Sequence, residues 1–250
     1  MTKVIEFLLV GLVGKYMGSW GQTTQVVVYA LSALGVIAVA YLLGSLNFAI
    51  IISAKQYNQD IRDYGSNNAG MTNMMRTYGR KAAALTLIGD ALKAVVACSV
   101  GYLVLGQMGA YMAGLFCIVG HIFPVFYKFK GGKGVVTAGI TILMCNPVAF
   151  LIVITIFLII VLFTRYISLG SVMSVLLYPL ILDRVDKLLP VWGVYENTEG
   201  SIGGIFAVII AVLITYKHWQ NIVRLFNGTE SKFSFKKSVK KADDENNAKK

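Results

Sequence analysis

Long apolar runs separated by short polar segments constrain this chain more than any other feature. Residues 147–164 read PVAFLIVITIFLIIVLFT and contain no charged side chain. A helix rises about 1.5 Å per residue, so a run of about this length crosses the roughly 30 Å hydrocarbon core of a bilayer. Backbone amides find no water in lipid, so each span must be helical. The runs predict an all-α, polytopic integral membrane protein with about seven transmembrane helices.

We place the spans at residues 28–54, 82–105, 108–127, 134–146, 147–164, 168–182 and 201–217. The fourth is short for a full crossing, which leaves a tilted, a broken and a re-entrant helix open. Only 14% of the residues are charged, against about 25% in soluble domains. Composition therefore agrees with a membrane protein.

Two terminal segments flank the predicted membrane-embedded domain at residues 28–227. We expect residues 1–27 to be an amphipathic or partly inserted extension, because no convincing signal-peptide cleavage site follows their apolar run. Residues 228–250 carry seven lysines against four acidic residues, without periodic apolar positions. That composition predicts a disordered tail beside the membrane.

Basic residues gather in alternate loops. Residues 55–81 contain five and residues 128–133 contain three, whereas the loops near 106–109 and 145–147 contain none. The positive-inside rule puts the basic loops and the C-terminus in the cytoplasm. The same rule accounts for most of the net charge of +11, so that charge does not indicate a nucleic-acid partner.

The polar insert at residues 60–76 is a candidate anion site. Glycine and asparagine permit positive φ, which lets successive N–H groups point into one concavity. Ser66 and Thr72 add hydroxyl donors, and Arg76 offers a planar fork that matches phosphate or carboxylate oxygens. The alternative is a solvated loop whose arginines only obey the positive-inside rule.

A second insert, Lys130-Gly131-Gly132-Lys133-Gly134, precedes an apolar run. Its glycines would lie at a helix N-terminus, where free N–H groups and the helix dipole attract anions. It matches neither the Walker A loop nor the G-x-G-x-x-G dinucleotide turn. A flexible turn with membrane-flanking lysines is the alternative.

Further polar residues fall on the same predicted face. His218 and Asn221 are three apart and share a helix face, which Arg224 extends; a plain interfacial role is the alternative. Ser168 and Ser171 begin a span, where serine often caps a helix.

Asp90 and Lys93 lie inside a span, where buried charges are costly unless paired, so we expect them to neutralise each other. We expect His121 to be structural. The three cysteines are widely spaced and lack metal-ligand spacing, and there is no G-x-S-x-G, H-E-x-x-H or H-x-x-x-x-D motif. The sequence therefore predicts no metal and no cofactor.

Several long motifs resemble those of the bacterial acyl-phosphate–glycerol-3-phosphate acyltransferase family. They occur in order and with the expected spacing between about Leu42 and Glu230. The motifs are Asp60–Arg62, Gly65–Arg76, Phe129–Thr137, Arg165–Ser171 and Lys217–Leu225.

The resemblance implies a seven-helix enzyme of the bacterial cell membrane with a cytoplasmic active site. It would move a fatty acyl group from acyl-phosphate to glycerol 3-phosphate, giving lysophosphatidic acid and phosphate in phospholipid biosynthesis. No acyl-carrier protein, coenzyme A or metal is implied, and a substrate phosphate would assist proton removal in place of a protein base. The implied catalytic residues are Arg76, Lys133, His218 and Asn221. The implied substrate-binding residues are Ser66, Asn67, Asn68, Thr72, Gly132, Gly134 and Ser171.

This chain departs from the family pattern at three positions. Asn67 replaces a usual glycine, Met71 a usual alanine and Asn47 a usual proline. Asparagine tolerates left-handed backbone geometry better than most residues, so we expect the phosphate loop to survive. A transporter of organic phosphates is the rival interpretation, although no inverted repeat is evident. A membrane scaffold with a lipid-binding tail would leave both polar inserts unexplained.

Overall fold

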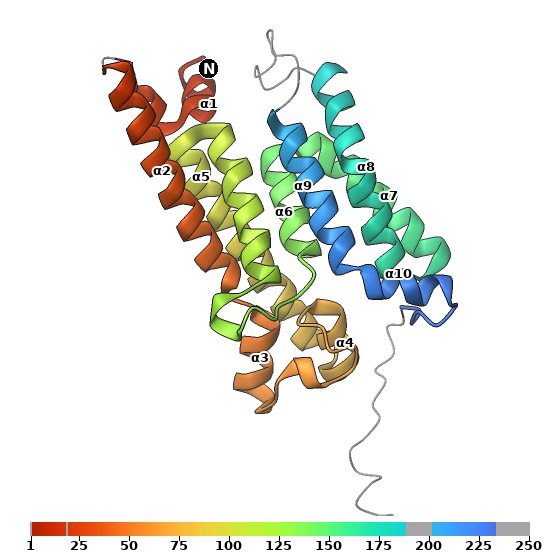
Figure 1. Cartoon of the computed structure of the whole chain (residues 1–250). Helices are drawn as coiled ribbons and strands as arrows, with labels where there is room; N and C mark the ends of the chain where they lie inside the picture. Colours follow the sequence, from red (N-terminus) through yellow and green to blue (C-terminus); the bar gives the residue numbers. More distant parts are fainter. Residues whose placement is uncertain (1, 19, 189–201, 234–250) are drawn as a thin grey trace, which may run out of the picture.

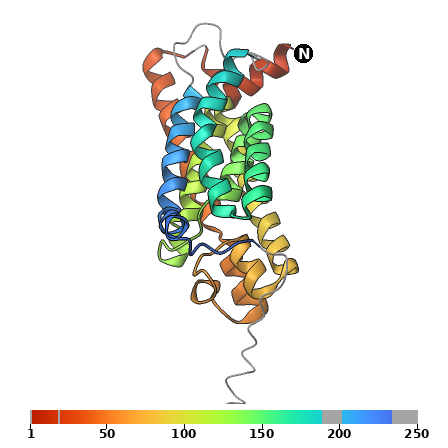
Figure 2. The same ribbon diagram turned by 90° about the vertical axis from the view of Figure 1, so that its right-hand side faces the viewer.

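The computed structural model describes residues 2–18, 20–188 and 202–233. Over these residues the chain is helical and contains no strand, so the predicted all-α class is confirmed. Most of the long helices stand side by side, and α3, α4 and α10 cover one end of the bundle (Figures 1 and 2). The elements are α1 Thr2–Met17, α2 Gln22–Ser45, α3 Phe48–Tyr57, η1 Ile61–Asp63, α4 Met71–Tyr78, α5 Arg80–Ile122, η2 Val125–Tyr127, α6 Val135–Cys145, α7 Pro147–Thr164, α8 Ile167–Leu188, α9 Ile202–Lys217 and α10 Trp219–Phe226.

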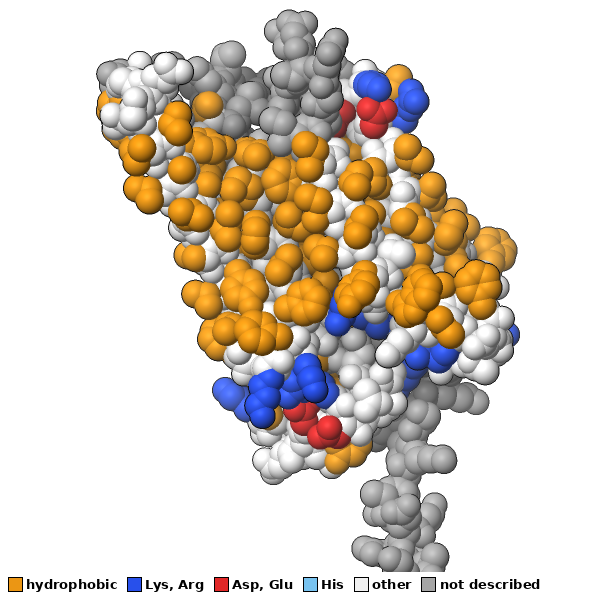
Figure 3. Space-filling model, in the orientation of Figure 1, with side chains coloured by type: hydrophobic (Ala, Val, Ile, Leu, Met, Phe, Trp, Pro, Cys, Tyr) orange, Lys and Arg blue, Asp and Glu red, His pale blue; other side chains and the backbone are white. Residues whose placement is uncertain are grey.

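Apolar side chains cover the middle of the bundle, and charged side chains gather at its two ends (Figure 3). On α7, Leu158, Leu162 and Phe163 are 56%, 75% and 81% exposed, which is stable only if lipid is the solvent. Four described helical stretches are long and apolar enough to cross a membrane, or five if α9 and α10, bent by 59°, form one span. That count treats α5 as one span, and the number seven stays a prediction.

α5 is a helical hairpin. Its backbone leaves helical geometry at Leu105 and Gly106, where φ of Gly106 is 63°. A Cβ on Gly101 would lie 2.2 Å from the carbonyl oxygen of Gly109, so the two limbs fold back with their backbones in contact. The break agrees with the predicted boundary between the spans at 82–105 and 108–127.

The predicted first span at 28–54 lies inside the stretch Gln22–Tyr57, which is long and apolar enough to cross a membrane but is divided into two helices. α2 begins at Gln22 and ends at Ser45, and α3 is a separate helix that starts at Phe48. The cause is Asn47, whose backbone is extended and whose side chain accepts from the N–H of Ile50 to cap α3. The segment 55–81, read as a loop, also contains η1 and α4, because its few apolar residues gave no periodic signal.

The predicted spans at 134–146 and 147–164 correspond closely to α6 and α7. Asn146 ends α6 and caps α7 by accepting from the N–H of Ala149, and Pro147 takes the first helical position. At the N-terminus, α1 packs on α5. The predicted disorder of the tail concerns residues 228–250, of which 234–250 lie outside the described residues.

Candidate functional site

A cleft of about 1980 Å³ opens at the end of the bundle that carries α3, α4 and α10. This exceeds the roughly 300–1,000 Å³ of a typical small-molecule pocket, so there is room for two reactants. Gly132 does not line the cleft. The other ten predicted site residues line it: Ser66, Asn67, Asn68, Thr72, Arg76, Lys133, Gly134, Ser171, His218 and Asn221.

The first loop is organised by Asn73, a buried residue that the sequence reading missed. Its Oδ1 accepts from the backbone N–H of Ser66 at 3.0 Å, and its Nδ2 donates to the carbonyls of Tyr64 at 2.8 Å and Asn68 at 3.1 Å. Gly65 adopts φ 61°, and a Cβ there would lie 2.2 Å from Asn73 Oδ1. A single amide therefore fixes the loop that carries Ser66 and Asn68.

Asn67 adopts φ 56°, the left-handed conformation that the family's usual glycine would adopt easily. Its Nδ2 donates to the carbonyl of Arg62 at 2.9 Å. The departure from glycine therefore leaves the loop formed. Asn47 also helps to hold this loop in place, since its Nδ2 donates to the carbonyl of Ala69 at 3.3 Å.

The glycine loop lies against the end of α5. The N–H of Gly132 donates to the carbonyl of His121 at 3.1 Å, and a Cβ on Gly132 would lie 2.2 Å from His121 Nε2. Gly132 therefore supports the loop from behind, and only glycine fits. Gly134 follows with φ 79° and is the N-cap residue of α6. Gly134, Val135 and Val136 line the cleft, so the N-terminus of α6 faces it.

Lys133 extends from this loop and donates to Oδ1 of Asn221. Burial, together with the positive charges of Arg224, Arg76 and Lys217, lowers the pKa of Lys133 to about 8. The carboxylate of Glu230 opposes this shift. A cation in such surroundings lacks sufficient counter-charge, which favours the binding of an anion beside it.

Glu230 is a second residue that the sequence reading missed, because it lies in the segment assigned to the disordered tail. Its carboxylate accepts from Ser168 Oγ at 2.6 Å, Asn221 Nδ2 at 2.7 Å and Arg224 Nε at 2.8 Å. Burial raises the pKa of this carboxyl, but the three hydrogen bonds together hold it below its usual value. Its acidity within a basic segment was the available signal.

His218 lies between α9 and α10, close enough to Lys133 for the lysine charge to act on its ring. Its Nδ1 is 2.8 Å from the carbonyl of Ile214, which can only accept, so Nδ1 carries the proton and Nε2 is an acceptor. Burial lowers the pKa of His218 to about 4, so the ring is neutral at pH 7. Ser171 lines the cleft and donates its hydroxyl to the carbonyl of Ile167 at 2.9 Å.

Asp90 and Lys93 lie deeper in the bundle, 2.8 Å apart, which confirms their predicted pairing. Lys93 Nζ also donates to the carbonyls of Gly44 at 2.9 Å and Leu46 at 2.8 Å, where α2 ends, and lies 2.9 Å from His121 Nδ1. Asp90 and His121 line the floor of the cleft. Among the described residues no group of three or more His, Cys, Asp or Glu side chains could hold a metal ion.

Comparison with known proteins decides the family. A family model described as glycerol-3-phosphate acyltransferase matches residues 34–228. The chain belongs to the glycerol-3-phosphate acyltransferase family. A member from Finegoldia magna is 40% identical over 197 residues, covering 78% of this chain and 92% of the relative. One from Coxiella burnetii is 40% identical over 200 residues, covering 78% and 95%.

Two crystal structures of PlsY (YgiH), an integral membrane glycerol 3-phosphate acyltransferase, share this fold. The glycerol 3-phosphate form is 34% identical with a TM-score of 0.72, covering 81% of this chain and 96% of that one. The lysophosphatidic acid form is 33% identical with a TM-score of 0.69, covering 82% and 96%. Together with the apolar helices, this likeness identifies a multi-pass membrane protein.

Proposed function

We propose that this protein transfers a fatty acyl group from acyl-phosphate to glycerol 3-phosphate, forming lysophosphatidic acid and phosphate. The observation that carries the proposal is the cleft, which joins a donor-rich end to an apolar groove along α7. The donor-rich end suits two phosphate groups, and the groove suits one hydrocarbon chain. With acyl-phosphate as donor, no acyl-carrier protein, coenzyme A or metal is required.

Hydrogen-bond donors from four segments of the chain line the polar end, at residues 65–76, 133–136, 165–171 and 218–224. Arg76 and Lys133 supply positive charge, while the first loop and the N-terminus of α6 supply backbone N–H groups. Two phosphate groups repel each other in water, and this set of donors would offset that repulsion. Holding both reactants in one geometry then supplies much of the rate.

The apolar groove follows one face of α7. Phe150, Val153, Phe157, Val161 and Leu162 line it at helical spacing. From Phe150 to Leu162 the helix rises about 18 Å. An acyl chain, at about 1.3 Å per carbon from C–C bonds of about 1.5 Å, would occupy this length with about 14 carbons.

The transfer step needs no protein base with a high pKa. A glycerol hydroxyl oxygen attacks the acyl carbonyl carbon, a C–O bond forms, and the bond from that carbon to the phosphate oxygen breaks. The hydroxyl proton passes to a phosphate oxygen, because His218, with a pKa of about 4, is a weak base. In this scheme Nε2 of His218 accepts from and orients the hydroxyl, while Lys133 and Arg76 stabilise the departing phosphate.

We further propose that residues 28–227 form the catalytic domain in the bacterial cell membrane, with the cleft and C-terminus on the cytoplasmic side. The basic segments at this end of the bundle support that orientation through the positive-inside rule.

The test supplies purified protein with palmitoyl-phosphate and labelled glycerol 3-phosphate. Labelled lysophosphatidic acid is the expected product, and Arg76→Ala should nearly abolish it, whereas Lys55→Ala removes an exposed cation outside the cleft and should not. If the protein forms lysophosphatidic acid with palmitoyl coenzyme A but not with palmitoyl-phosphate, acyl-phosphate is not the donor. Flux of glycerol 3-phosphate into proteoliposomes without any product would favour a transporter.

A further inference from the structure

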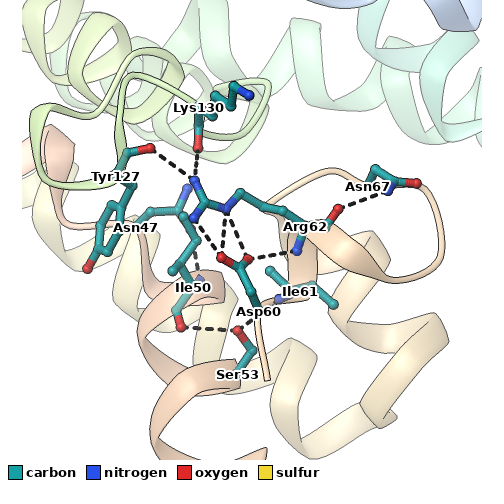
Figure 4. Close-up of polar contacts among 9 residues, drawn as sticks. All are labelled: Asn47, Ile50, Ser53, Asp60, Ile61, Arg62, Asn67, Tyr127 and Lys130. Carbon is teal, nitrogen blue, oxygen red and sulfur yellow. Dashed lines mark hydrogen bonds and ion pairs between the residues drawn. The ribbon is translucent and has the colours of Figure 1, made fainter. Parts of the chain in front are cut away.

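A charged pair behind the cleft connects its two anion-binding loops. Asp60 and Arg62 flank Ile61 at η1, and neither lines the cleft. Arg62 donates from Nε to Asp60 Oδ1 at 2.9 Å and from Nη2 to Asp60 Oδ2 at 2.6 Å. The backbone N–H of Arg62 donates to the same carboxylate at 2.9 Å (Figure 4). The guanidinium is therefore held in one orientation before it touches any other segment.

The remaining nitrogen of this fork reaches the second loop. Nη1 of Arg62 donates to the carbonyl of Tyr127 at 3.0 Å and to that of Lys130 at 3.1 Å (Figure 4). These two carbonyls lie at the two ends of residues 127–130, the segment directly before Gly131. Lys130 is three residues before Lys133. A lysine could not make the same contacts, because its ammonium is a single point of charge and not a planar fork.

The segment that Arg62 holds has a strained backbone. Lys128 and Phe129 adopt φ 55° and 58° in succession, a left-handed conformation that costs energy for side chains with a Cβ. Both side chains are exposed, so their own packing does little to stabilise it. Strained backbone persists only where its surroundings fix it. Here the N–H of Phe129 donates to the carbonyl of Pro124 at 3.0 Å and that of Lys130 to the carbonyl of Tyr127 at 3.2 Å, and the two bonds from Arg62 add the hold of another segment.

Arg62 also contacts the first loop through its backbone. Its carbonyl accepts from Nδ2 of Asn67 at 2.9 Å (Figure 4). One residue therefore touches the loop of Ser66 and the loop of Lys133, which are far apart in the sequence. The two phosphates of the proposed reaction would bind to these two loops.

We propose that Arg62, oriented by Asp60, is a positioning residue that fixes the spacing between the two anion-binding loops without touching substrate. When Arg62 is lost, the loops spend only part of the time at the productive spacing. The apparent affinity for substrate then falls by the fraction of protein in the competent state. Saturating substrate selects that state, so kcat should change much less than KM.

The test compares Arg62→Gln, Arg62→Lys and Asp60→Asn. Lys128→Gln is the control, because it removes one exposed charge from the segment that Arg62 contacts. We expect KM for glycerol 3-phosphate to rise at least tenfold in both Arg62 variants, which corresponds to a competent fraction of about 10% or less. Asp60→Asn should give a smaller rise in KM, and Lys128→Gln should stay within about twofold of wild type. The melting temperatures should remain close to wild type, since the pair is partly exposed.

Three outcomes overturn the proposal. The first is full recovery of KM in Arg62→Lys, which would show that only charge matters. The second is a fall in kcat at unchanged KM, as expected from a merely structural defect. The third is wild-type KM in Asp60→Asn, which decides the matter even if the Arg62 variants do not fold.

The kinetic assay rests on the proposed acyl-phosphate donor, so calorimetric binding of glycerol 3-phosphate alone provides a separate readout. Its dissociation constant should rise by about the same factor as KM. If wild type binds glycerol 3-phosphate but gives no product, the proposed donor fails while the comparison of dissociation constants still tests Arg62.

Discussion

Raising the pH from 7 to 9 should weaken substrate capture about tenfold through one residue, Lys133. Burial and neighbouring positive charges lower its pKa to about 8. The ammonium form, which attracts a phosphate, exists below that pKa and is lost as the pH rises through it. The protonated fraction is about 90% at pH 7 and about 10% at pH 9, whereas an unshifted lysine would remain about 95% protonated at pH 9.

The assay is kcat/KM for glycerol 3-phosphate between pH 6.5 and 9.5, because this ratio reports the pKa values of the free enzyme. A phosphate monoester has its second pKa at about 6 and stays dianionic over most of this range. Uncatalysed hydrolysis of the acyl-phosphate is measured at each pH and subtracted. Melting temperatures at both ends of the range check that the protein remains folded.

Lys133→Arg provides the matched control, since a guanidinium stays charged throughout this range. Its kcat/KM should be lower than wild type because the group is larger, but independent of pH between 7 and 9. A wild-type profile that is level up to pH 9.5 would refute the reasoning. The same alkaline decline in Lys133→Arg would assign that decline to another group.

Substitutions at three further positions test other parts of the structure. Lys93→Met leaves Asp90 buried without its ion pair, which costs about 3–5 kcal/mol of unfolding free energy. At about 2–4 °C per kcal/mol, the melting temperature should fall by about 6–20 °C, measured by the labelling of the buried cysteines with a thiol-reactive dye during heating. Asn67→Gly should keep turnover within about twofold of wild type, whereas Asn67→Val, which resists positive φ, should raise KM for glycerol 3-phosphate severalfold. Gly139 leaves open space in the groove, with only Phe150 within 4 Å of an added Cβ, at 3.8 Å. Gly139→Leu should therefore shift the preference from palmitoyl- toward lauroyl-phosphate in a competition assay, and an unchanged product ratio would contradict it.

The sequence predicted the features that depend on composition and order. The uncharged run at residues 147–164 corresponds to α7. Its boundary with α6 agrees with the structure, where Asn146 caps α7 and Pro147 takes the first helical position. The break at Asn47 was missed because the residues on both sides are apolar, so hydropathy continues across it. A single capping side chain begins a new helix there.

The candidate site divides in the same way. Ten of its predicted residues line one cleft. They could be predicted because they belong to long sequence motifs. Asn73 lies inside one of these motifs, but its role depends on three carbonyls that only the folded loop brings together. Glu230 was missed because the composition of residues 228–250 describes the segment as a whole. The hydrogen bonds of Glu230 depend on where its own carboxylate lies in the folded protein.

The hairpin in α5 has a consequence for how this architecture can vary. Between the loop of Ser66 and the loop of Lys133 the chain runs away along one limb and returns along the other. α6 with α7, and α8 with α9, make the same return journey before Ser168 and His218. In the predicted seven-span topology each return makes an even number of crossings, so a single inserted or deleted helix would move every later donor to the opposite side of the membrane. Additions between these segments must come as hairpins, whereas a helix ahead of them, such as α1 outside the family match at 34–228, alters no parity within the site.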